Sequence, residues 1–177
     1  MTIEAVVALK TLSQSKRRLS AVLNDSQRYG LVEAMAQDVL SCLMAHPEID
    51  TVHAVCGEGW KRSALPEGPL VVWQEAESQE GGLIAAYEMI AAKTVAERLL
   101  FIHADLPFLG HEDISAVIAA SLDHHAVFSP DLSETGTNAV LRWRHQSMPL
   151  CFGDSSFARH RQAAETAKTP WRVVLAR

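Results

Sequence analysis

The segment RLLFIHADLP, residues 98–107, decides the fold that the sequence predicts. Four apolar residues, Leu99–Ile102, follow one another without the alternation of a half-exposed strand. This pattern predicts a strand that is buried on both faces, as in a mainly parallel sheet with helices on either side. The strand should end at His103, and Asp105 follows it with Pro107 stiffening the next turn.

Similar runs recur on both sides of this segment and alternate with longer amphipathic stretches. Strands are predicted at residues 3–9, 51–56, 70–74, 98–103, 126–129, 138–143 and 171–175. Helices are predicted at residues 24–46, 82–96, 111–122 and 155–168, the first with a cap at Asn24, Asp25 or Ser26 and the second opened by the pair Gly81-Gly82. This order predicts an α/β protein with three layers, α/β/α, around a mainly parallel (mixed) central sheet. All 177 residues are expected to form a single domain.

Composition and charge narrow the classes of function. The chain is 48% hydrophobic and 21% charged, which is ordinary for a globular protein. A net charge of −5 argues against a nucleic-acid partner, because such binding needs a basic face. No apolar stretch reaches the roughly 20 residues that span a bilayer, and the N-terminus lacks the pattern of a signal peptide. We therefore expect a cytoplasmic protein without a membrane partner, and three reduced cysteines.

Basic residues cluster where the first strand should end. In such sheets ligands bind beyond the carboxyl ends of the strands. The first predicted strand leads into KTLSQSKRRL, residues 10–19, which we call the basic segment. As a flexible loop with four cations it would suit a triphosphate, although a solvated basic turn gives the same pattern. No classical phosphate-binding glycine loop is present.

Asp105 is a candidate metal ligand, since a carboxylate held just beyond a buried strand suits Mg²⁺. This ion prefers one or two carboxylates together with phosphate oxygens from a substrate. The alternative is that Asp105 caps a turn before the helix that begins at His111. If the strand continues regularly, His103 and Asp105 point to the same face, so His103 either contacts a ligand or packs in the core.

Two further segments could bind an anion. Gly136 permits a tight turn, and Thr137 and Asn138 offer hydrogen-bond donors, although many hairpins look similar. The segment FGDSSFARH, residues 152–160, places a glycine and two serines at the start of a helix, with an arginine nearby. A helix N-terminus of this kind attracts anions, although an ordinary serine or aspartate cap would also explain it.

Taken in order, these segments resemble the 2-phospho-L-lactate guanylyltransferase family of the MobA-like nucleotidyltransferase superfamily. The matching stretches are LKTLSQSKRRLSAVL (9–23), QDVL (37–40), GGLIAA (81–86), FIHADLP (101–107), SPD (129–131), GTNAVL (136–141) and FGDSSFARH (152–160). They span nearly the whole chain. FIHADLP alone indicates the wider superfamily, whereas GTNAVL followed by FGDSSFARH indicates this family.

The resemblance implies a nucleotide-diphospho-sugar transferase-like fold and an enzyme that uses GTP and Mg²⁺ in the biosynthesis of coenzyme F-420. The acceptor would be 2-phospholactate, phosphoenolpyruvate or 3-phosphoglycerate. The resemblance assigns the metal to Asp105 and the catalytic cations to Lys16 and Arg18. It assigns the nucleotide to Lys10, Gly82 and Leu83, and the phosphate of the acceptor to Thr137, Gly153 and Ser156. The oligomeric state stays open, with a homodimer among the alternatives.

Two features depart from the resemblance. Family members continue into an aspartate-rich segment that supplies a second metal ligand, whereas this sequence stops at Arg177, so this segment is expected to be lacking. Ile84 stands where the family often has asparagine, which weakens the argument for GTP over another nucleotide. The alternatives are therefore another MobA-like nucleotidyltransferase, or a nucleotide-binding protein that has lost catalysis.

Overall fold

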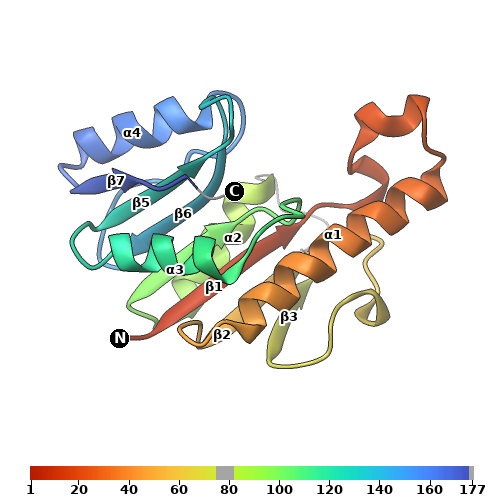
Figure 1. The fold of residues 1–177 in the computed structure, drawn as a ribbon, viewed down its shortest axis with the longest axis horizontal. Helices are drawn as coiled ribbons and strands as arrows, with labels where there is room; N and C mark the ends of the chain where they lie inside the picture. Colours follow the sequence, from red (N-terminus) through yellow and green to blue (C-terminus); the bar gives the residue numbers. More distant parts are fainter. Residues whose placement is uncertain (75–81, 176–177) are drawn as a thin grey trace.

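In the computed structural model, which describes residues 1–74 and 82–175, seven strands form one sheet in the order β3-β2-β1-β4-β6-β5-β7 (Figure 1). The strands are β1 (Ile3–Leu9), β2 (Thr51–Cys56), β3 (Leu70–Gln74), β4 (Arg98–Ile102), β5 (Ala126–Pro130), β6 (Thr137–Trp143) and β7 (Trp171–Val173). The chain starts in the middle of the sheet, builds outward to β3, and then returns to add β4 on the other side of β1.

One strand reverses the direction of the sheet. β3, β2, β1 and β4 run parallel, β6 pairs antiparallel with both β4 and β5, and β7 is parallel to β5. The predicted mainly parallel, mixed sheet is therefore confirmed. Because β6 is reversed, its first residue, Thr137, lies at the edge where β1, β4 and β5 end. We call this edge the carboxyl edge.

Helices cover both faces, as predicted. One face packs against α1 (Asp25–Ala45) and α3 (His111–Ala120), and the other against α2 (Gly82–Lys93) and α4 (Ser156–Thr166). Alternate residues of β4 divide between the two cores: Leu100 and Ile102 join the first, Leu99 and Phe101 the second. The sheet is therefore buried on both sides, which explains the unbroken apolar runs in the sequence.

The helix ends follow local hydrogen bonding. The α1 helix begins after Asn24, whose side chain accepts from the Gln27 N–H (2.9 Å) while Gln27 bonds back to the Asn24 N–H (3.1 Å). The α2 helix ends at Lys93, before the predicted Ala96, and Thr94 next to it takes a hydrogen bond from the Ala96 N–H (3.1 Å). Gly81, predicted to open α2, lies outside the described residues. The α3 and α4 helices are each two or three residues shorter than predicted.

Other expectations concern the membrane and the cysteines. Within residues 1–74 and 82–175, no helix has both the length and the apolar character that a bilayer span requires. Cys42, Cys56 and Cys151 are free thiols, as expected. Cys56 is buried, and the other two are half-buried.

Candidate functional site

A polar cleft of about 370 Å³ opens at the carboxyl edge beside β1 and β4. Its walls come from the basic segment, the helices α1 and α2, and the connection from β4 to α3. Six of the residues singled out in the sequence line it: Lys10, Lys16, Arg18, Leu83, His103 and Asp105. Gly82 stands next to Leu83 at the first position of α2 with φ +56°, a left-handed conformation that favours glycine.

The cleft brings the basic segment to the candidate metal ligand. Lys16 Nζ lies 2.7 Å from Asp105 Oδ2, although the two residues are 89 positions apart. Burial alone would raise the pKa of Asp105, but the hydrogen bond and charge of Lys16 outweigh it and hold that pKa below its ordinary value. Asp105 is therefore an ionised carboxylate, partly open to solvent, with a cation beside it.

The basic segment is more structured than the flexible loop expected from the sequence. It forms two short 3-10 helices, η1 (Leu12–Gln14) and η2 (Arg17–Ala21), which Figure 1 shows between β1 and α1. Lys16 joins them with φ +49°, an uncommon conformation for a residue with a side chain. This turn directs Lys16 toward Asp105.

Arg28 of α1 supports the basic segment, and sequence reasoning missed it. Its guanidinium is buried and donates to the carbonyl oxygens of Ser13 (3.3 Å) and Ser15 (2.6 Å). It also pairs with Asp25 at 2.6 Å. A buried arginine that binds two carbonyls fixes the backbone on which Lys16 sits. The only signal in the sequence is an arginine in the first turn of the helix that follows the basic segment.

Two contacts hold the beginning of the basic segment against the end of β2. Trp60 donates its indole N–H to the Lys10 carbonyl oxygen (2.8 Å). Gly57 packs so closely that a Cβ there would lie 2.6 Å from the Thr11 nitrogen. Trp60 also lines the cleft. A side chain at position 57 would displace the first residues of the basic segment.

His103 lies between the cleft and a second polar region. β4 ends at Ile102, so the regular strand expected to carry His103 and Asp105 stops earlier, although the His103 N–H still bonds to the Asn138 carbonyl (3.0 Å). The ring packs edge-on against Phe152 (5.1 Å between centroids) and interacts with the backbone of Thr137. Burial lowers the pKa of His103. His103 is half-buried, packs against Phe152 and forms part of the cleft wall.

The three residues predicted to hold the acceptor do not line the cleft; they belong to a region on the far side of His103. Thr137 begins β6, Ser156 begins α4, and Gly153 lies in the connection before α4. Gly153 has φ +107°, and a Cβ there would approach Arg159 Nη2 to 3.3 Å. Arg159 itself donates to the Phe152 carbonyl (2.9 Å), which keeps a positive charge beside Gly153.

Three alternatives from the sequence can be compared with the coordinates. The turn before α3 is closed by the Leu109 N–H and the Leu106 carbonyl oxygen (3.1 Å), and α3 itself is capped at Gly110, whose N–H bonds to Asp113 (3.0 Å). Ser155, the N-cap of α4, makes no capping hydrogen bond with its side chain. The tight turn expected at Gly136 is present, and the Gly136 N–H donates to Asp131 Oδ2 (3.0 Å), so this N–H is satisfied by an aspartate of the same turn.

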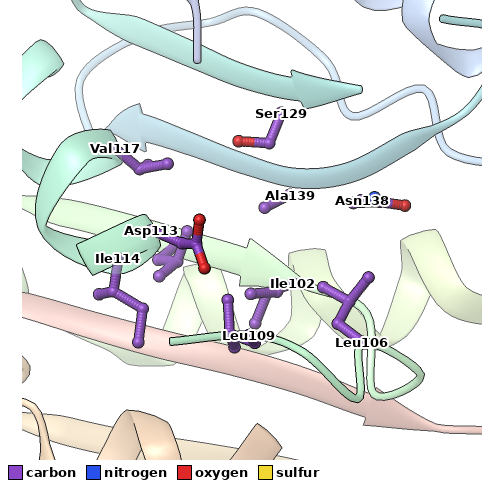
Figure 2. Close-up of a pocket in the computed structure, with 10 residues that line it drawn as sticks. Ile102, Leu106, Leu109, Asp113, Ile114, Val117, Ser129, Asn138 and Ala139 are labelled. Carbon is purple, nitrogen blue, oxygen red and sulfur yellow. The ribbon is translucent and has the colours of Figure 1, made fainter. Parts of the chain in front are cut away.

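A smaller cavity lies between β4 and α3, on the face of the sheet that α1 and α3 cover. Figure 2 shows the Ser129 hydroxyl and the Asp113 carboxylate among mainly apolar walls, which include Ile102, Leu106 and Ile114. Its volume of about 20 Å³ is close to the room for one water molecule. Ser129 Oγ is buried and has no hydrogen-bond partner among the described residues. This cavity is too small for a nucleotide.

Asp105 alone would bind a divalent ion weakly. Among residues 1–74 and 82–175, no group of three His, Cys, Asp or Glu side chains is arranged to hold a metal. An ion at Asp105 would therefore take most of its ligands from water and from the phosphates of a substrate. Mg²⁺ commonly binds in this way, so the single ionised carboxylate in an open, phosphate-sized cleft fits it.

Comparison with known proteins gives consistent results. The family model described as "Guanylyl transferase CofC like" matches residues 3–173. The phosphoenolpyruvate guanylyltransferase of Sphaerobacter thermophilus is 32% identical over 175 residues, covering 98% of this chain and 84% of that protein. The 2-phospho-L-lactate guanylyltransferase of Methanothermobacter thermautotrophicus is 30% identical over 158 residues, covering 88% of this chain and 68% of that protein.

The fold has solved counterparts. A putative nucleotide-diphospho-sugar transferase from Desulfovibrio desulfuricans superimposes with a TM-score of 0.80 at 14% identity, covering 99% of this chain and 80% of that one. The similarity in structure confirms the nucleotide-diphospho-sugar transferase-like fold that the resemblance implied.

Proposed function

The chain belongs to the family of CofC-like guanylyl transferases, and from this premise we propose that it transfers a guanylyl group from GTP to a small phosphorylated carboxylic acid. One observation carries the proposal: a single cleft at the carboxyl edge joins the ionised Asp105 to Lys16 and the rest of the basic segment. This arrangement is suited to a triphosphate with a bound metal.

The side chains of the basic segment would bind the triphosphate. Lys10, Lys16 and Arg18 reach the cleft from one backbone segment. Together they would neutralise much of the charge that develops on pyrophosphate as it leaves. Lys16 has to exchange its partner for this task, turning from Asp105 to a phosphate when the nucleotide binds. Leu83 would pack against the nucleoside, with Gly82 allowing the backbone to approach.

Mg²⁺ is the cofactor that we propose, held by Asp105. When bound, it would act as a Lewis acid that draws negative charge from the phosphates. The protein's own contribution is the position and ionisation of the carboxylate. Lys16 keeps the pKa of Asp105 low, and Arg28 keeps Lys16 in place.

The chemical step needs no general base. A phosphate oxygen of the acceptor attacks the α-phosphorus of GTP, a new P–O bond forms, and the bond to the β-phosphate oxygen breaks to release pyrophosphate. The attacking oxygen is already an anion, so no side chain has to remove a proton. Catalysis would rest on positioning and on stabilisation of charge.

The acceptor side would be formed by Thr137, Gly153 and Ser156, with the Arg159 guanidinium nearby. The two relatives act on phosphoenolpyruvate and 2-phospho-L-lactate according to their names, and 3-phosphoglycerate shares the same chemical groups. We propose an acceptor of this class and a place in coenzyme F-420 biosynthesis. A cytoplasmic location, expected from the sequence, is part of the proposal.

The test is a turnover assay with purified protein, Mg²⁺, GTP and each of the three acceptors in turn. Pyrophosphate release should depend on the acceptor, and mass spectrometry should detect the guanylylated acid. ATP, CTP and UTP serve as matched controls for the nucleotide. Absence of pyrophosphate with every acceptor, while calorimetry still shows binding of GTP with Mg²⁺, would support a nucleotide-binding protein without catalysis.

A further inference from the structure

His160 is held more firmly than packing alone requires. It lies in α4, its side chain is fully buried, and two aromatic rings enclose it. Phe128 stacks on it with 5.5 Å between centroids, and Phe152 meets it edge-on at 5.0 Å. A ring held on two sides in this way keeps a fixed orientation, so its two nitrogens keep fixed partners.

The partners of these nitrogens determine where the ring proton lies. The Cys151 N–H donates to Nε2 (2.8 Å), and a backbone N–H can only donate, so Nε2 must be the unprotonated nitrogen. In the neutral ring Nδ1 then carries the proton. Nδ1 lies 3.0 Å from Thr137 Oγ1, so the ring donates to this hydroxyl. The proton of the Thr137 hydroxyl is therefore free to be donated elsewhere.

Burial keeps the ring neutral. Desolvation lowers the pKa of His160 to about 4, with a further contribution from the charge of Arg159. The ring is thus neutral at neutral pH and keeps the same tautomer. The carbonyl of Ser156 also interacts with the ring. His160 therefore contacts the start of β6, the segment before α4 and the first residue of α4.

We propose that His160 is a positioning residue of the acceptor site: it accepts from Cys151, donates to Thr137, and so sets the Thr137 hydroxyl to donate to the phosphate of the acceptor. This inference rests on the proposed function for the identity of the acceptor. The same ring ties Thr137 to the segment that carries Gly153 and Ser156, so the geometry of the three residues depends on one side chain.

Two substitutions separate the two hydrogen bonds. In His160→Asn the amide N–H takes the place of Nδ1 and can still donate to Thr137, while the Cys151 N–H loses its acceptor. In His160→Gln the amide oxygen takes the place of Nε2, and Thr137 loses its donor. We expect the Gln variant to raise the KM for phosphoenolpyruvate about tenfold and the Asn variant by less than about threefold. The KM for GTP should be unchanged in both.

A further substitution tests whether the effect passes through Thr137. In a Thr137→Val background the hydroxyl is gone, so the Asn and Gln variants should have the same KM for phosphoenolpyruvate. A merely structural role for His160 would instead give a difference that persists in this background. Equal KM values for the two variants with Thr137 intact would overturn the proposal.

Nitrogen-15 NMR of the wild-type protein without substrate tests the tautomer directly. The expected spectrum has a proton on Nδ1 and none on Nε2 of His160, unchanged between pH 6 and 8. A proton on Nε2, or titration near the ordinary histidine pKa, would overturn the proposal even if both variants failed to fold. If the wild type shows no turnover, the proposed function fails; calorimetric affinity for phosphoenolpyruvate in the two variants then replaces KM.

Discussion

The two polar regions of the carboxyl edge hold their groups in opposite ways. The basic segment and Asp105 carry formal charges that are partly open to solvent, with the Lys16 and Asp105 side chains 34% and 44% exposed. The His160, Thr137 and Ser156 side chains are buried and uncharged, and the hydrogen bonds of the His160 ring are made within the protein. An exposed ion pair is weak and can exchange partners, whereas a buried network is fixed.

This difference matches two different tasks. A site for a triphosphate and a metal has to release its internal ion pair when these ligands arrive. A site that orients a small acceptor benefits from groups that are already in place before it binds. We therefore expect substitutions in the basic segment or at Asp105 to affect catalysis and the binding of GTP. Substitutions around His160 should affect the binding of the acceptor and the stability of the fold.

The largest effect should come from Asp105→Asn, which removes the only carboxylate among the described residues that line the cleft. We expect the rate of pyrophosphate release to fall about 10³-fold, because the charge that holds the metal is lost. The thermal midpoint should change little, since Asp105 is partly exposed. Asp123→Asn, at an exposed carboxylate elsewhere, is the control. A rate within threefold of wild type would show that another group holds the metal.

The burial of His160 should make the stability of the protein depend on pH. The pKa of His160 is about 4 in the folded protein and about 6.5 when unfolded. Between these values the unfolded chain binds more protons, so stability falls as the pH decreases from 6.5 towards 4, by about 3 kcal/mol in total. Urea unfolding at several pH values measures this loss.

The matched variant for this measurement is His160→Asn, which cannot take up the proton. Its stability should fall less over the same pH range. His46 and His103, whose pKa values are also lowered by burial, contribute equally to both proteins and cancel in the comparison. Identical pH profiles in the two proteins would contradict a neutral, buried His160.

Lys16→Met should have an intermediate effect. It removes one cation from the triphosphate and leaves Asp105 without its partner, so we expect kcat/KM for GTP to fall ten- to a hundredfold, on the order of 1.4 to 2.7 kcal/mol. The KM for the acceptor should stay within about twofold, because the acceptor region lies beyond His103. Lys168→Met, at an exposed lysine outside the cleft, is the control. A larger change in KM for the acceptor than in kcat/KM for GTP would contradict the assignment of the two regions to different substrates.

The smallest effect should come from Ser129→Ala in the cavity of Figure 2. Its hydroxyl has no hydrogen-bond partner among the described residues, so its removal should change the free energy of unfolding by less than about 1 kcal/mol. Turnover should be unchanged, because none of the residues that line this cavity lines the cleft. A loss of activity would indicate that the packing of this cavity affects the cleft.

The sequence by itself determined the layers and the location of the site. Unbroken apolar strands and amphipathic helices predicted the α/β/α architecture, because burial on both faces leaves no other pattern for the strands. The rule that ligands bind at the carboxyl ends of the strands led to Asp105 and to a basic segment with four cations, and the structure places Asp105 and three of these cations, Lys10, Lys16 and Arg18, in one cleft. The functions of these residues, and those of Thr137, Gly153 and Ser156, stay predictions.

Only the tertiary structure decided the contacts between distant segments. The reversal of β6 brings Thr137 to the edge where β4 ends, and no local pattern in the sequence shows that β6 pairs with β4. Arg28 and His160 hydrogen-bond to residues that lie from 9 to 23 positions away in the sequence. Arg28 bonds to backbone carbonyls, and His160 bonds to a backbone N–H and a hydroxyl. Such bonds depend on how elements pack rather than on residue type, and for this reason periodicity and composition predict the framework but not the side chains that align the site within it.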